Sequence, residues 1–250
     1  MLRKTQIFAH RGANRSAAEN TRTAFDLALK DDINGMETDV QLSRDEVTVL
    51  WHDRFLDKVG LPGKHLDDFD FAELQAMDFA AHFAPSGPAE SVMRLKDFIE
   101  RYRSRTRLLL EIKNRDWETP ARQQLKVRQT LALVGARNGD EILISSFNLD
   151  SLVYAHQCAP NFPLVYNMEP EHTLADARAV LSEHSFLYGF CLHISRLSAE
   201  MAALLRSHNK IIAVYTCNSD AEIRQALDLE ADILISDVPQ QALMMRDHAA

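Results

Sequence analysis

Short runs of apolar, mostly β-branched residues alternate with longer amphipathic stretches along almost the whole chain. The strand-like runs span residues 5–9, 35–40, 47–51, 107–112, 142–146, 163–167, 187–192, 211–215 and 232–235. Helical periodicity falls between most of these runs, at residues 20–30, 121–136, 149–158, 174–183, 198–208 and 220–228. Consecutive parallel strands need a long crossover, and an amphipathic helix supplies one. The alternation therefore predicts an α/β fold with a parallel sheet.

Nine strand-like runs are one more than a (β/α)₈ TIM barrel contains. Only a four-residue turn separates residues 35–42 from 47–51, whereas a parallel crossover needs about a dozen residues or more. We therefore expect a hairpin at the barrel rim, with Leu42 opposite Val47, which leaves eight parallel strands. In the alternative arrangement the chain descends outside the barrel, and 47–51 is itself a barrel strand. Both arrangements place His52 near the barrel mouth.

Residues 54–106 differ from the rest of the chain in composition and pattern, because they hold Pro/Gly clusters at 61–63 and 85–88 and no convincing strand. We expect this segment to be a small helical insertion that ends in a helix at 93–102. The remaining residues, about 200, are enough for a TIM barrel. Residues 1–250 are thus predicted to form a single TIM-barrel domain with the insertion inside it.

Composition narrows the possible partners and compartments. The chain has 28 Lys and Arg against 36 Asp and Glu, a net charge of −8, which argues against a nucleic-acid partner. No apolar stretch approaches the ~20 residues that span a bilayer, and the first residues lack the apolar core of a signal peptide. Three widely spaced cysteines, an odd number, indicate a reducing compartment. We expect a cytoplasmic protein without stable membrane anchoring, and an oligomer is left open.

Charged and titratable residues gather toward the C-terminal ends of the early predicted strands. They are His10 with Arg11, Glu37 with Asp39, His52 with Asp53, and Glu111 with Lys113. Residues two apart on a strand point to the same face, so Glu37 and Asp39 share one face. TIM-barrel enzymes carry their catalytic residues at the C-terminal ends of the strands. These four groups are therefore candidate active-site residues.

The residue types indicate phosphate chemistry. Glu37, Asp39 and Glu111 would be costly to bury together unless a cation neutralised them. Oxygen ligands without cysteine favour Mg²⁺ or Ca²⁺ over zinc. Arg11 and Lys113 add fixed positive charge for an anionic substrate such as a phosphate ester. Two histidines that exchange protons near neutral pH complete a set typical of phosphoryl transfer or phosphodiester cleavage.

The same residues belong to motifs of a known family. The motifs are His10-Arg11-Gly12, Ala18-Glu19-Asn20-Thr21, Glu37-x-Asp39-Val40, His52-Asp53, Glu111-Ile112-Lys113, Ser145-Ser146-Phe147, Val214-Tyr215-Thr216-Cys217-Asn218 and Ser236-Asp237-Val238-Pro239. In this order they resemble the glycerophosphodiester phosphodiesterases over nearly the whole chain. The chain departs from the family at Ala18, where proline is usual, and at Tyr215, where tryptophan is common.

The resemblance implies a phosphodiesterase, a metal-dependent hydrolase that converts small-molecule glycerophosphodiesters to sn-glycerol 3-phosphate and an alcohol. It also implies a divalent cation, Mg²⁺ or Ca²⁺, as cofactor. By the same resemblance the metal ligands are Glu37, Asp39 and Glu111, the catalytic acid and base His10 and His52, and the substrate contacts Arg11, Lys113 and Tyr215. Which histidine is the acid and which the base stays open.

Two further acidic residues are candidates for supporting roles. Glu19 lies at a helix start, and we expect it also to orient Arg11. Asp53 is consistent equally with a solvated hairpin end and with a partner that fixes His52.

Two rival functions remain at this stage. One is a phospholipase C- or D-like lipid phosphodiesterase, which would need an exposed apolar rim, and the phenylalanines at 69, 71, 79 and 83 are candidates for it. The other is a non-catalytic barrel that binds phosphodiesters. The full set of titratable and liganding residues argues against the second, since binding alone does not need it.

Overall fold

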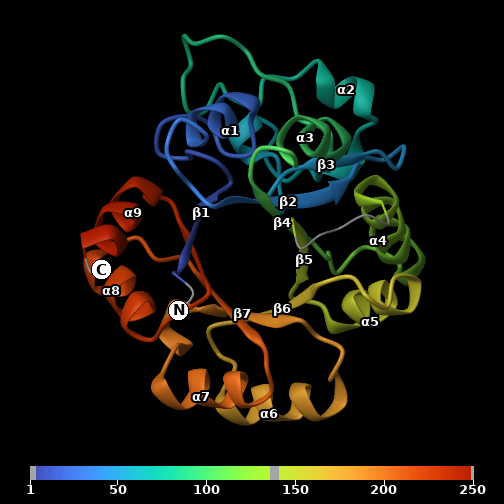
Figure 1. Cartoon of the computed structure of the whole chain (residues 1–250). Coiled ribbons are helices and arrows are strands. Elements are labelled where there is room, and N and C mark those ends of the chain that lie inside the picture. Colours follow the sequence, from blue (N-terminus) through green and yellow to red (C-terminus); the bar gives the residue numbers. More distant parts are fainter. Residues whose placement is uncertain (1–3, 136–140, 249–250) are drawn as a thin grey trace.

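A computed structural model describes residues 4–135 and 141–248, and its strands form a closed ring with the helices outside it (Figure 1). The strands are β1 (Gln6–His10), β2 (Gly35–Leu42), β3 (Thr48–Leu50), β4 (Arg107–Ile112), β5 (Ile142–Ser146), β6 (Leu164–Met168), β7 (Gly189–His193), β8 (Ile211–Tyr215) and β9 (Ile233–Ser236). The ring runs β1-β9-β8-β7-β6-β5-β4-β2 and closes through the β1–β2 pairing. All pairings in the ring are parallel. The predicted (β/α)₈ TIM barrel is therefore confirmed.

The α-helices follow the predicted periodicity closely. They are α1 (Arg22–Ala28), α2 (Phe71–Gln75), α3 (Leu95–Tyr102), α4 (Pro120–Val134), α5 (Leu149–Cys158), α6 (Leu174–Glu183), α7 (Ala199–Ser207), α8 (Asp220–Asp228) and α9 (Pro239–His248). The helix predicted at 121–136 corresponds to α4, and residue 136 lies outside the described residues. Helix α9 was not predicted, because only its initial Pro239 is a start signal and its apolar side chains form no clear stripe.

The extra strand β3 lies outside the ring and pairs antiparallel with β2, so the predicted hairpin is confirmed and the alternative barrel strand is wrong. The predicted register is wrong by one residue, since Leu42 pairs with Thr48 and not with Val47. The reason lies in the turn: the N–H of Ser43 donates to the carbonyl oxygen of Val47 at 3.0 Å. The turn is therefore one residue wider than expected.

The segment between β3 and α3 packs on the outer side of the hairpin, at the top of Figure 1. It contains α2 and two short 3₁₀ turns, Asp57–Val59 and Leu66–Asp68, so its helical content is confined to short pieces. An apolar cluster joins it to β3, and the rings of Trp51 and Phe79 meet edge to face with centroids 5.2 Å apart. The segment is thus held by its own small core against the hairpin.

The interior of the barrel changes from apolar to charged toward the mouth. Side chains alternate along a strand, so Phe8 and His10 face inward on β1, as Leu109 and Glu111 do on β4. Phe8 and Leu109 belong to the buried apolar layer inside the ring. The next inward positions along the same strands carry the imidazole of His10 and the carboxylate of Glu111.

Within the described part of the chain, no helix has the length and apolarity needed to cross a bilayer.

Candidate active site

A cavity of about 320 Å³ opens at the barrel mouth, above the apolar layer. Seven of the predicted site residues line it: His10, Arg11, Glu37, His52, Glu111, Lys113 and Tyr215. The other three, Glu19, Asp39 and Asp53, contact members of this set through ion pairs. The structure therefore brings all ten predicted side chains to one end of the barrel.

Three buried carboxylates lie together on β2 and β4. In the barrel register Asp39 pairs with Glu111, and Glu37 lies two residues before Asp39 on the same face of β2. One oxygen of each carboxylate lies within 4.8 Å of the others. Burial and the two neighbouring carboxylates raise the pKa of Glu37 well above its usual value. Negative charge is thus crowded into a site with little access to water.

The donor set fits a divalent cation. Among the described residues, no donor makes a hydrogen bond of good geometry to three buried oxygens: Glu37 Oε2, Asp39 Oδ1 and Glu111 Oε1. The ammonium of Lys113 offsets part of this charge, at 3.1 Å from Asp39 Oδ1 and 2.5 Å from Glu111 Oε1. For Glu37 the only ion pair found among the described residues is with His10 Nε2, at 3.9 Å. Buried carboxylate oxygens of this kind need a cation, and Mg²⁺ and Ca²⁺ prefer such ligands.

Arg11 reaches the carboxylates from the turn that follows β1. Its backbone and that of Gly12 have positive φ angles of 56° and 80°, and a Cβ at position 12 would lie 2.7 Å from the backbone of Ala24. Glycine is therefore required there to let the turn approach α1. Arg11 Nε lies 3.2 Å from Asp39 Oδ2, and its Nη1 donates to Glu19 Oε2 at 3.1 Å. The guanidinium is thus held between two carboxylates.

His10 is held by a residue from the other end of the chain. Its Nδ1 lies 2.6 Å from Asp237 Oδ1, in the loop after β9. Asp237 also accepts hydrogen bonds from the side-chain amides of Asn14 (2.6 Å) and Asn218 (2.7 Å). Burial would raise the pKa of Asp237, but the hydrogen bond and charge of His10, with the two amides, hold it well below its usual range. Burial and the charge of Arg11 lower the pKa of His10, against the opposing effect of Asp237.

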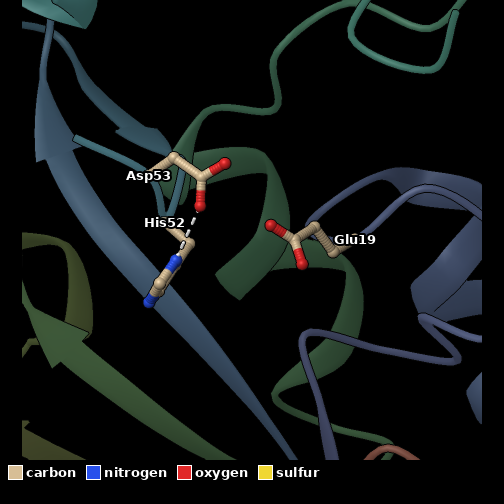
Figure 2. A group of neighbouring side chains, drawn as sticks. All are labelled: Glu19, His52 and Asp53. Atoms are coloured by element: carbon tan, nitrogen blue, oxygen red, sulfur yellow. Dashed lines mark hydrogen bonds and ion pairs between the residues drawn. The ribbon is translucent and has the colours of Figure 1, made fainter. Parts of the chain in front are cut away.

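His52 stands on the hairpin side of the mouth. Its ring lines the cavity. Figure 2 shows the carboxylate of Asp53 bonded to the ring, with Nδ1 and Oδ1 2.9 Å apart. Lys58, in the first 3₁₀ turn, lies 2.9 Å from both Asp53 Oδ2 and Glu19 Oε1. The gap between Glu19 and Asp53 in Figure 2 is therefore bridged by a lysine, which joins the support of His52 to that of Arg11.

Sequence reasoning assigned no role to three residues of this site: Asp237, Asn20 and Lys58. Asn20 is buried, has a φ of 58°, donates through Nδ2 to Asp39 Oδ2 at 2.9 Å and accepts from the hydroxyl of Thr38 at 2.7 Å. Burial opposes ionisation of Asp39, but Lys113, Arg11 and the Asn20 bond keep its pKa well below normal. Asp237 and Asn20 each lie in a motif noted above, which is the signal that could have found them.

Two aromatic side chains, Tyr215 and Phe147, line the same cavity. Tyr215 ends β8 and donates through its hydroxyl to the carbonyl oxygen of Met168 at 2.8 Å. Its ring meets that of Phe147 edge to face, with centroids 5.8 Å apart. In the same cavity Asn167 is buried, and its Oδ1 accepts no hydrogen bond from the part of the chain that the structure describes. The cavity thus combines charged groups and aromatic rings with a buried acceptor, Asn167 Oδ1.

Comparisons with known proteins find relatives and similar folds over nearly the whole chain. A glycerophosphodiester phosphodiesterase of Bacillus altitudinis is 28% identical over 250 residues, covering 97% of this chain and 98% of the relative. A solved phosphodiesterase of Oleispira antarctica, in complex with the product sn-glycerol-3-phosphate, has a TM-score of 0.86 at 24% identity, covering 97% of this chain and 96% of that one. A glycerophosphodiester phosphodiesterase of Thermotoga maritima has a TM-score of 0.76 at 22% identity, covering 96% and 98%.

Family membership follows from the extent of the match. The glycerophosphoryl diester phosphodiesterase family pattern matches residues 10–241, from the first histidine of the site to a point beyond Asp237. The matched range contains all the side chains described above. This chain belongs to the glycerophosphoryl diester phosphodiesterase family.

Proposed function

We propose that this protein hydrolyses glycerophosphodiesters to sn-glycerol 3-phosphate and an alcohol. The observation that carries the proposal is the meeting of three clustered, buried carboxylates with two fixed cations and two imidazoles at one cavity. The named product in the Oleispira antarctica structure supports the same reaction, as does the family itself.

We propose that Glu37, Asp39 and Glu111 hold a divalent cation, either Mg²⁺ or Ca²⁺. Such a cation, when bound, supplies positive charge to a phosphate oxygen and stabilises the charge that develops there. Arg11 and Lys113 border the carboxylates and hold the remaining phosphate charge. Their role is electrostatic, because both stay protonated throughout.

The two histidines carry the proton transfers in this proposal. Each turns Nδ1 toward a carboxylate, His10 to Asp237 and His52 to Asp53. A carboxylate accepts, so Nδ1 holds a proton and Nε2 is left to exchange one with the substrate. One Nε2 takes the proton of the nucleophile, and the other gives a proton to the leaving alkoxide.

The remaining predicted residues support these groups. Glu19 orients Arg11, and Asp53 fixes the ring of His52. Tyr215 forms the wall against the alcohol. The free Oδ1 of Asn167 is placed to accept a hydrogen bond from a glycerol hydroxyl, which would otherwise lose its water partner in the cavity.

The surface favours a small substrate over a lipid. Of the four phenylalanines in the insertion, Phe79 is buried, and Phe69 and Phe71 pack against the same apolar cluster. Phe83 is 42% exposed. A single exposed ring is a poor apolar rim.

We propose further that the chain is one barrel domain with 54–106 as its insertion, and that it is cytoplasmic, which its three free cysteines support.

The test is release of sn-glycerol 3-phosphate from glycerophosphocholine, glycerophosphoethanolamine and glycerophosphoglycerol, with EDTA and with Mg²⁺ or Ca²⁺ restored. We expect release that EDTA abolishes and one of the metals restores. Glu111→Gln keeps the shape of the side chain and should lower kcat at least ~10²-fold, with weaker metal binding in calorimetry. Glu183→Gln is the matched control, because its side chain is 73% exposed at the end of α6. No release from any substrate with either metal would overturn the proposal.

A further inference from the structure

The backbone that carries His52 is held by side chains as well as by the pairing of β3. Just after β3, the carbonyl oxygens of Trp51, His52 and Asp53 each accept a hydrogen bond from a side chain. Gln41 Nε2, from β2, donates to Trp51 (2.6 Å) and Asp53 (3.2 Å). Arg115 Nη2, from the loop after β4, donates to His52 (2.5 Å) and Asp53 (2.9 Å). The place from which the His52 ring extends therefore depends on these two side chains.

Arg115 joins the two side chains into one unit. Its Nε donates to Gln41 Oε1 at 3.2 Å, so turning the Gln41 amide over would break bonds at both of its ends. One guanidinium thus donates to two backbone carbonyls and to one amide, and its rigid planar shape sets the three directions together. A lysine ammonium has no such fixed geometry.

Arg115 is in turn held by a buried ion pair at the start of α4. The backbone N–H of Arg115 donates to Glu118 Oε2 at 3.1 Å. Glu118 accepts from Lys126 Nζ at 2.7 and 2.8 Å, and the same ammonium donates to the carbonyl oxygen of Lys113 at 2.5 Å. The side chains of Lys126 and Glu118 are 0% and 3% exposed. The pair therefore ties together the loop that runs from Lys113 to Glu118.

A buried ion pair of this kind is a weak source of stability. The loss of hydration of two charges offsets much of their attraction, and apolar side chains of similar size often stabilise a protein as well or better. The bonds of this pair bear instead on the shape of the loop. The ammonium fixes the loop at Lys113, and the carboxylate fixes it at Arg115.

We infer that Arg115 is a positioning residue, which holds His52 where its imidazole can exchange a proton with the substrate, and that the Lys126–Glu118 pair holds Arg115. The inference rests on the proposed function and adds to the support that His52 receives from Asp53. Asp53 orients the ring, whereas Arg115 fixes the backbone from which the ring extends. Arg115 itself transfers no proton, because its guanidinium stays protonated.

The test is a double-mutant cycle on kcat, with the diester of the three above that the wild type hydrolyses fastest. Arg115→Met makes none of the three side-chain bonds and should lower kcat about five- to tenfold, with KM within about twofold of wild type. In the His52→Ala background the same change should cost less than about twofold, because the ring that Arg115 positions is gone. In the His10→Ala background it should cost the full five- to tenfold. Arg115→Lys should restore only part of kcat.

Two further variants separate positioning from stability. Arg128→Met is the control, because Arg128 is exposed on α4 and donates to Tyr154, away from the cavity. The double variant Lys126→Met, Glu118→Leu replaces the buried pair with apolar side chains of similar size. It should change Tm by only a few degrees while kcat falls about two- to fivefold, since the loop loses its tie to Arg115. A loss of Tm with kcat unchanged would show that the pair supports the fold alone.

A measurement without turnover keeps this inference separate from the proposed function. In proton–nitrogen correlation spectra of the imidazoles, assigned with His52→Ala and His10→Ala, Arg115→Met should shift the His52 resonances and leave those of His10 in place. Unchanged His52 resonances, or an undiminished effect of Arg115→Met in the His52→Ala background, would overturn the inference and leave the proposed function standing. No hydrolysis by the wild type would overturn the proposed function, and the spectra alone would then decide whether Arg115 sets the position of His52.

Discussion

His10 and His52 share one chemical role in the proposal, yet the molecule supports them in different ways. His10 ends a barrel strand, its side chain is 15% exposed, and its carboxylate partner Asp237 comes from the last barrel loop. His52 follows the hairpin strand outside the ring, is 33% exposed, and has a partner next to it in sequence. Closing the barrel is what places the first pair. The hairpin and the insertion place the second.

The two proton transfers therefore depend on different parts of the molecule. Asp237 is held by amides from two separate loops, Asn14 and Asn218, so the position of His10 is fixed by the barrel itself. Asp53 is held by Lys58, which is 37% exposed and belongs to the insertion. Substitutions of the residues that hold His52 should therefore lower activity less than substitutions of those that hold His10.

The largest effect should come from removing either imidazole. His10→Ala and His52→Ala should each lower kcat about 10²–10⁴-fold, because each removes one proton transfer. Steady-state release of glycerol 3-phosphate measures this, with circular dichroism as the check on folding. His156→Ala is the matched control, since that histidine lies on α5, away from the cavity. If either active-site variant kept kcat within about twofold of wild type, a single imidazole would suffice and the paired roles would be wrong.

Replacing the carboxylate partner of each histidine should lower activity by different amounts. Asp237→Asn should lower kcat roughly 10–100-fold, because the ring of His10 loses both its orientation and the charge opposite Nδ1. Asp53→Asn should cost less than about tenfold, because His52 is more exposed and water can replace its partner. KM should change little in either variant, since neither carboxylate lines the cavity. A larger loss in Asp53→Asn than in Asp237→Asn would reverse the comparison.

The contact between His10 and Asp237 predicts that the free energy of unfolding depends on pH in the acid range. The fold holds the pKa of Asp237 below its usual value of about 3.9, so its ionised form stabilises the protein above that pH and the contribution is lost as the pH falls through the lowered value. Asp237→Asn should therefore lower the free energy of unfolding by about 1–3 kcal/mol at pH 7, and the difference from wild type should shrink below about pH 4. Urea titrations at pH 7 and pH 3 would show this. A difference that stays constant would mean that the carboxylate is not stabilised in the fold.

Most of the fold could be predicted from the sequence because its signals are local. Strand-like runs and helical periodicity mark the barrel units, and a short turn between residues 42 and 47 identifies the hairpin. The register of that hairpin was missed by one residue, since it depends on how Ser43 closes the turn. Helix α9 was missed because its amphipathic pattern is weak.

The site could be predicted from the sequence only where its residues stand in recognisable motifs. The carboxylates, cations and imidazoles stand in recognisable short motifs on separate strands. Asp237 lies 227 residues from His10, and only barrel closure brings the two together. Lys58 stands in a loop of the insertion with no motif at all, so nothing local predicts that it bridges two site carboxylates. Contacts that depend on packing between distant loops are the part the sequence does not reveal.

The smallest loss of activity should come from removing Lys58, which bridges Glu19 and Asp53. Lys58→Met should lower kcat/KM about two- to fivefold, the effect of losing a partly exposed ion pair, because Glu19 and Asp53 then repel each other and loosen Arg11 and His52 together. Lys58→Arg should restore most of the activity, since a guanidinium can bridge the same two carboxylates. Steady-state kinetics of both variants would be compared with wild type.

Lys64→Met is the control for this bridge, because Lys64 is exposed in the same segment and does not line the cavity. Combining Lys58→Met with Asp53→Asn tests whether the lysine acts through Asp53. If the lysine acts on His52 through Asp53, the double variant should lose less than the product of the two single losses. Fully multiplicative losses would mean that the insertion supports Arg11 alone, and the two sides of the mouth would then be less different than their contacts imply.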